Sequence, residues 1–147
     1  MSLTYKNIIV AVDGSKESEL AFKRAIQVAI NNKGSILYIA HVIDTRRFAV
    51  YDSYNLKIAE QAHELAMDML KKYVQQAIFA GVEDVKTILE YGSPKQIIAR
   101  DIPKAKKIDL IICGVTGKGE VERFLLGSVS EALVRSAKCD VLVVRKL

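Results

Sequence analysis

The sequence contains few of the residues that build small specialised folds. Its 147 residues include two cysteines, two prolines, eight glycines and no tryptophan. Two cysteines cannot form the framework of a disulfide-rich scaffold, and with only two histidines they offer no metal-ligand spacing. The scarcity of proline and glycine excludes collagen-like and low-complexity chains. We therefore expect a chain that is stabilised by a hydrophobic core.

Long apolar runs and blocks of like charge are also missing. No apolar run approaches the ~18 residues of a membrane span. The early run at 8–12 is too short for a signal-peptide core. No targeting segment is visible, so we expect a cytoplasmic protein. The net charge is +5, but no basic block is long enough for a nucleic-acid arm.

The composition is that of a globular protein. Half of the residues are hydrophobic and 27% are charged, which excludes disorder as the dominant state. The length predicts a single domain over residues 1–147.

Apolar patterns alternate between strand and helix along the chain. Runs rich in β-branched residues predict strands, and apolar residues at helical spacing predict the helices between them. Such alternation is typical of an α/β fold with a parallel sheet and crossover helices on both faces. Residues 44–55 lack a period and are expected to form a long loop. The predicted strands span 8–12, 36–43, 85–91, 108–113 and 141–144.

Local signals predict where the helices begin and end. Ser15 is a candidate N-cap, and Gly34 is expected to cap the end of the same helix. Capping boxes are predicted at Ser93–Gln96 and at Ser128–Glu131. Pro103 should end or kink its helix near Asp101.

Two predicted strand ends carry residues suited to binding a ligand. Asp13-Gly14-Ser15 follows the first strand, and Gly114-Val115-Thr116-Gly117-Lys118-Gly119 follows the fourth. Ligands of open parallel sheets bind beyond the carboxyl ends of the strands. A glycine-rich segment lets backbone amides approach a phosphate, and the helix starting at Ser128 would add its positive dipole end. Lys118 would add a mobile charge.

Other interpretations of these residues remain open from the pattern alone. The glycines could simply shape a strand-to-helix loop, since a lone glycine-rich loop is a weak signal. The segment is neither a Walker loop nor a Rossmann fingerprint. Asp13 could accept a ribose hydroxyl, hold a metal through water, or shape the turn. We expect His41 to be a structural residue rather than a catalytic base, and His63 has no evident partner.

Several motifs, in order along the whole chain, resemble the universal stress protein family. The spacing Gly114-x2-Gly117-x9-Gly127-Ser128 is similar to the ATP-binding signature of that family. The remaining matching segments are Val10–Ser15, His41-Val42, Tyr91–Pro94, Leu125–Ser130 and Cys139–Arg145.

The resemblance implies a five-stranded flavodoxin-like sheet in the order 3-2-1-4-5 and membership of the ATP-binding branch. In the family's pattern, adenine and ribose would lie near Val12, Asp13 and Val42. The phosphates, carrying Mg²⁺ or Mn²⁺, would lie on the glycine loop and the following helix. The corresponding residues are Gly114, Gly117, Gly127, Ser128, Val129 and Ser130, and Lys118 is a further candidate from the chemistry of the loop itself.

The chain departs from the family pattern at a few positions. Cys113, Val115 and Thr116 stand where members often have Met, Ser and a basic residue. The missing basic residue should weaken phosphate binding, with Lys118 compensating in part. Asp140 replaces a frequent proline.

These features favour an ATP-binding stress-response or signalling protein. An efficient ATPase would need a positioned base and electrostatic clamps that the sequence does not offer, so hydrolysis should be slow at most. The alternative is a protein-interaction module with a vestigial pocket. The apolar last strand, 141–144, predicts an unpaired sheet edge, and the family resemblance implies a homodimer formed through it.

Overall fold

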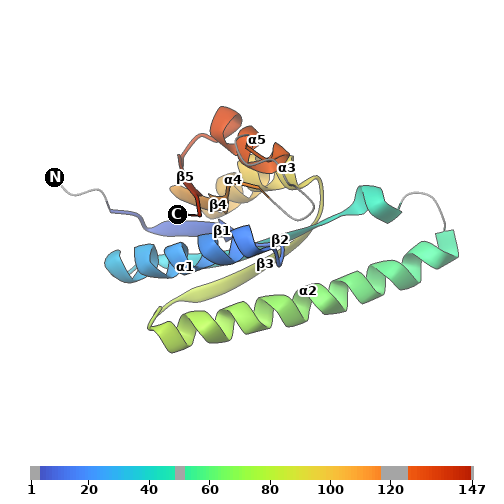
Figure 1. The fold of residues 1–147 in the computed structure, drawn as a ribbon, viewed down its shortest axis with the longest axis horizontal. Helices are drawn as coiled ribbons and strands as arrows, with labels where there is room; N and C mark the ends of the chain where they lie inside the picture. Colours follow the sequence, from blue (N-terminus) through green and yellow to red (C-terminus); the bar gives the residue numbers. More distant parts are fainter. Residues whose placement is uncertain (1–3, 49–51, 117–125, 147) are drawn as a thin grey trace.

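The computed structural model contains one five-stranded parallel sheet (Figure 1). It describes residues 4–48, 52–116 and 126–146. The strands follow the order β3-β2-β1-β4-β5, which confirms the predicted order. The strands are β1 (Asn7–Ala11), β2 (Ile36–Asp44), β3 (Val85–Gly92), β4 (Leu110–Gly114) and β5 (Asp140–Val144).

Helices cover both faces of the sheet, as the alternating pattern predicted. Figure 1 shows α1 and α2 on one side and α3, α4 and α5 on the other. The helices are α1 (Lys16–Asn31), α2 (Asp52–Ala80), α3 (Pro94–Gln96), α4 (Ile102–Lys106) and α5 (Ser128–Ser136). A short 3-10 helix, η1 (Thr45–Phe48), follows β2, and a π-helical turn, η2 (Ile97–Asp101), joins α3 to α4. No helix of the described ranges is long and apolar enough to cross a bilayer.

The sheet separates two hydrophobic clusters, because successive side chains of a strand point to opposite faces. Ile8 and Val10 pack with α1 and α2, where the rings of Phe22 and Tyr73 meet edge-on with centroids 4.6 Å apart. Ile9, between them in β1, packs on the other face with Ile98 and neighbouring apolar residues. Burial on both faces explains the nearly continuous apolar runs of the strands.

Two predictions about chain path need correction. The loop expected over 44–55 is largely replaced by η1 and by α2, which begins at Asp52. Pro103 was predicted to end or kink its helix near Asp101, and the helix does not end there, because the wider turn of η2 continues directly into α4. Pro103 has no N–H to donate, and the π-helical turn accommodates that gap in the hydrogen-bond ladder.

The predicted helix caps are only partly right. Ser15 caps α1, since its Oγ accepts from the backbone N of Ser18 at 3.1 Å. The C-cap of α1 is Asn32 rather than Gly34.

Both predicted capping boxes are wrong. Ser93 is the N-cap of α3 and Pro94 starts that helix, as predicted, but the Ser93 side chain makes no cap bond. Gly127, not Ser128, is the N-cap of α5.

The histidine of α2 has a partner that the sequence did not indicate. His63 Nδ1 hydrogen bonds to the hydroxyl of Tyr91, and the two rings lie stacked with their planes 4° apart. This pair fastens α2 to the carboxyl end of β3.

Candidate functional site

A cavity of about 450 Å³ lies at the carboxyl ends of the strands, between β1, β2 and β4. Both candidate segments border it, although they are far apart in the sequence. Eight of the ten predicted site residues line it: Val12, Asp13, Val42, Gly114, Gly127, Ser128, Val129 and Ser130. The other two, Gly117 and Lys118, lie outside the described residues.

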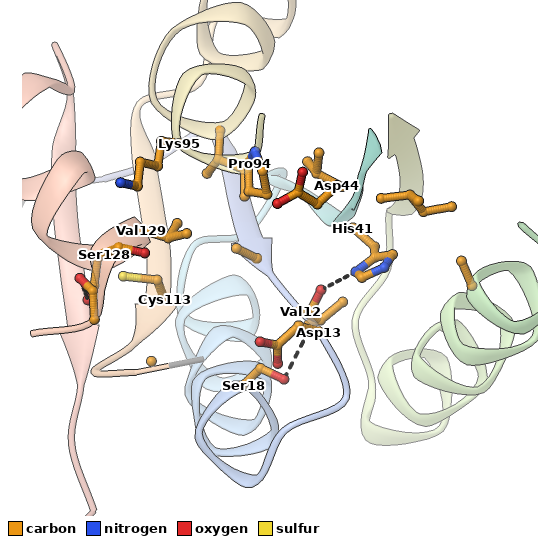
Figure 2. A pocket seen from close by; sticks show the side chains of 18 of the residues that line it. Val12, Asp13, Ser18, His41, Asp44, Pro94, Lys95, Cys113, Ser128 and Val129 are labelled. Atoms are coloured by element: carbon orange, nitrogen blue, oxygen red, sulfur yellow. Dashed lines mark hydrogen bonds between the residues drawn. The ribbon is translucent and has the colours of Figure 1, made fainter. Parts of the chain in front are cut away.

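The turn after β1 holds Asp13 at the cavity. One carboxylate oxygen, Oδ1, accepts from the backbone N of Ser15 at 2.9 Å. The backbone N of Asp13 donates to Ser18 Oγ at 3.2 Å, as Figure 2 shows. Asp13 therefore shapes the turn that starts α1, which was one of its possible roles, and it also borders the cavity.

His41 ties β2 to the end of β1. Its Nδ1 lies 2.7 Å from the carbonyl oxygen of Val12 (Figure 2). Because a carbonyl oxygen only accepts, Nδ1 must carry the proton in this contact. The bond fixes the end of β1 relative to β2 in the cavity wall, which is the structural role that the sequence favoured for His41.

Hydrogen bonds close the base of the glycine loop. The backbone N of Gly127 donates to the carbonyl oxygen of Val115 at 2.8 Å. Ser130 Oγ lies 2.6 Å from the same oxygen and 3.1 Å from the carbonyl oxygen of Gly127. These contacts, which we call the loop neck, hold the end of β4 against the start of α5.

Close packing explains the glycine at the end of β4. A Cβ built on Gly114 would lie 2.9 Å from the backbone carbon and oxygen of Glu17, in the first turn of α1. Real Cβ atoms essentially never approach so closely. Gly114 therefore allows the β4 loop and the start of α1 to border one cavity.

The start of α5 presents backbone donors to the cavity. Ser128, Val129 and Ser130 form the first turn of this nine-residue helix. Amides of the first turn have no partner within the helix, and the helix dipole places partial positive charge there. This end of the cavity suits an anion.

Apolar side chains form another part of the lining. Val12 and Val42 come from the ends of the strands, and Ala66 and Met69 come from α2. Cys113 also lines the cavity, and burial raises the pKa of its thiol to about 12. The thiol is therefore neutral at physiological pH and acts as a small apolar group.

Charged residues that the sequence reasoning missed also border the cavity. Arg46 binds the carboxylate of Asp44, with Nη2 2.5 Å from Oδ2 and Nε 2.9 Å from Oδ1. Lys95 reaches the cavity from α3. Asp44 ends β2, and Arg46 and Lys95 come shortly after β2 and β3. The carboxyl ends of these strands share an edge with that of β1, and this position could have indicated that the three residues border the site.

The described lining contains no ready-made metal site. Within residues 4–48, 52–116 and 126–146, no group of three or more His, Cys, Asp or Glu side chains could hold a metal ion.

Comparisons with known proteins agree with this fold and motif set. The model of the Universal stress protein family matches residues 4–145. Protein SH1215 of Staphylococcus haemolyticus is 49% identical over 143 residues, 97% of this chain and 86% of that protein. The structure of universal stress protein UspA from Lactobacillus plantarum is 28% identical with a TM-score of 0.87, covering 98% of this chain and 100% of that chain. A universal stress protein in complex with cAMP is 26% identical with a TM-score of 0.75, covering 97% of this chain and 98% of that chain. The chain belongs to the universal stress protein family.

Proposed function

We propose that this chain binds ATP in the cavity and acts as a nucleotide-dependent stress-response protein. The observation that carries the proposal is that one cavity offers both apolar side chains and the first-turn amides of α5. A nucleotide needs both kinds of contact, since its base is flat and largely apolar on its faces and its phosphates are anionic.

The adenosine end of the ligand would lie against Val12, Asp13 and Val42. Val12 and Val42 are buried apolar residues that border the cavity. Asp13, at the end of β1, would accept a hydrogen bond from a ribose hydroxyl.

The phosphates would lie between the loop and α5. Gly114, Gly127 and the amides of Ser128–Ser130 would approach them closely, with Gly117 and Lys118 contributing from the loop. The hydroxyl of Ser130 already holds the loop neck, so its amide is the better candidate for direct contact. Mg²⁺ or Mn²⁺ would be bound mainly by phosphate oxygens. The cAMP complex of a family member supports a nucleotide as the class of ligand.

The expected output is a change of conformation or partner rather than rapid turnover. Fast phosphoryl transfer needs a positioned base and electrostatic clamps on the transferring group, and the glycine loop offers one lysine, Lys118, and no arginine among residues 114–119. We therefore expect turnover to stay below the ~1–100 s⁻¹ of kinases. A rate in that range with saturating ATP and Mg²⁺ would favour an enzyme instead.

Calorimetric titration with ATP and Mg²⁺ tests the proposal directly. After any co-purified ligand has been removed, we expect one site per chain with a dissociation constant of roughly 1–100 μM, about −8 to −5.5 kcal/mol. Absence of binding up to millimolar ATP would contradict the proposal and favour the interaction module with a vestigial pocket.

We also propose a homodimer through β5. This strand lies at the edge of the sheet and contains the half-buried Val141, Leu142 and Val143. Antiparallel pairing of two copies would cover the edge and bring Asp140 of one copy toward Arg145 of the other. Sedimentation at micromolar concentration should give twice the 16.3 kDa mass of one chain. A monomer at that concentration would contradict this arrangement.

A further inference from the structure

Lys95 lies where it can act on an anion at the start of α5. It follows Pro94 beyond the carboxyl end of β3 and borders the cavity. Figure 2 shows it on the same side of the pocket as Ser128 and Val129, with Asp44 and His41 across from them. Contacts between α3 and α5 hold this side of the pocket together.

Lys95 differs from Arg46, the other basic residue in the described part of the lining, because Arg46 is paired with an acidic residue. The charged residues of the described lining are Asp13, Asp44, Arg46 and Lys95. Arg46 is engaged by Asp44 through several hydrogen bonds. Among the residues that the structure describes, no ion pair joins Lys95 to an acidic side chain.

Backbone amides and a lysine contribute differently to anion binding. The amides of α5 bear partial charges at fixed positions, whereas a lysine ammonium brings a full mobile charge with three donors. A full charge interacts more strongly as the number of phosphates rises, while the amides contact a fixed number of oxygens. Thr116, in the described start of the loop, brings no charge to the cavity.

We propose that Lys95 binds the phosphate chain of the nucleotide and makes affinity rise with the number of phosphates. The inference rests on the proposed function, since it needs a nucleotide in this cavity. Lys95 would be a specificity-determining residue on the wall outside the glycine loop, and it would favour ATP over AMP and adenosine.

The test compares ATP, AMP and adenosine on wild-type protein and on Lys95→Gln. Because Gln is polar and uncharged and only one atom shorter than Lys, we expect ATP affinity to fall about tenfold, or ~1.4 kcal/mol. Adenosine affinity should change by less than about twofold, so the ratio of ATP to adenosine affinity should fall. Lys95→Arg, which keeps the charge, should restore most of that ratio.

Lys104→Gln is the matched control. Lys104 is an exposed lysine in α4, the same helical run, and it does not border the cavity. The control should bind all three ligands as the wild type does, and thermal unfolding should be nearly unchanged in every variant.

The possible failures are distinguishable. Wild-type protein that binds none of the nucleotides would overturn both proposals. Wild-type binding of ATP that Lys95→Gln leaves intact would overturn only the role of Lys95. Equal losses of ATP and adenosine in Lys95→Gln would also overturn it, because they would indicate a general change in the cavity.

Discussion

Gly127→Val should weaken ATP binding at least about 100-fold, equal to ~2.8 kcal/mol. Gly127 borders the cavity and immediately precedes the first-turn amides of α5. A branched side chain here would occupy the space through which a phosphate approaches those amides. Each hydrogen bond to a charged group contributes roughly 1.5–3 kcal/mol, so losing two of them accounts for the effect.

The variant should keep its fold. Gly127 has φ −65° and ψ 166°, a conformation that any L-residue adopts. Its backbone bond to Val115 in the loop neck does not depend on a side chain. Circular dichroism and thermal unfolding check the fold, and calorimetry measures the affinity for ATP.

Gly127→Ala provides the graded comparison. A single methyl group should weaken ATP binding less than the branched side chain does. If Gly127→Val folds and still binds ATP as the wild type does, the phosphates cannot lie at the start of α5.

Gly114→Ala should reduce both stability and ATP affinity. The added methyl would lie 2.9 Å from backbone atoms of Glu17, so α1 or the end of β4 must move. Overpacking of this kind costs about 1–3 kcal/mol in the free energy of unfolding. For a chain of this length, Tm should fall by about 2–4 °C for each kcal/mol. Displacing either element also disturbs the cavity that both of them border.

Gly34→Ala is the control that separates the loss of stability from the loss of ATP affinity expected for Gly114→Ala. Gly34 has φ +84° and nothing within 4 Å of an added Cβ, so alanine strains the backbone without a clash. Gly34 precedes β2 and does not border the cavity. This variant should lose stability while keeping ATP affinity. An undisturbed Tm in Gly114→Ala would show that the contact with Glu17 relaxes at little cost.

The sheet was predictable because its information is local and periodic. The runs beginning at Ile8 and Ile36 are nearly continuous because both faces are buried, and parallel topology places their carboxyl ends at one edge. The same topology places Asp13 and Gly114 at one edge, and the strand order implied by the family resemblance makes their two strands neighbours.

Features that depend on geometry within a turn were not predictable. The sequence Ser128–Glu131 fits a capping box, yet Gly127 takes the N-cap position because the loop neck places it there. Likewise, the proline rule predicts a break or a kink near Asp101, but it does not specify that a π-helical turn will carry the helix into Pro103.

The charged cavity residues were missed for a different reason. Asp44 and Arg46 come from a segment with no motif of its own, and Lys95 lies in the Ser93–Gln96 pattern, which indicated only a helix start. Their position emerges only when β2 and β3 are aligned beside β1, with Ile43 opposite Tyr91.

The loop neck has a consequence for protein engineering. Because Val115 is bonded to Gly127 and Ser130 by contacts outside residues 117–125, the start of α5 is held independently of what that segment contains. Loops of other lengths are tolerated thermodynamically when their ends are fixed, since each doubling of length costs only about 0.6 kcal/mol. The segment 119–124, which leaves out the proposed phosphate contacts Gly117 and Lys118, is thus a natural grafting position for a peptide tag or an environment-sensitive fluorophore while α5 stays in place.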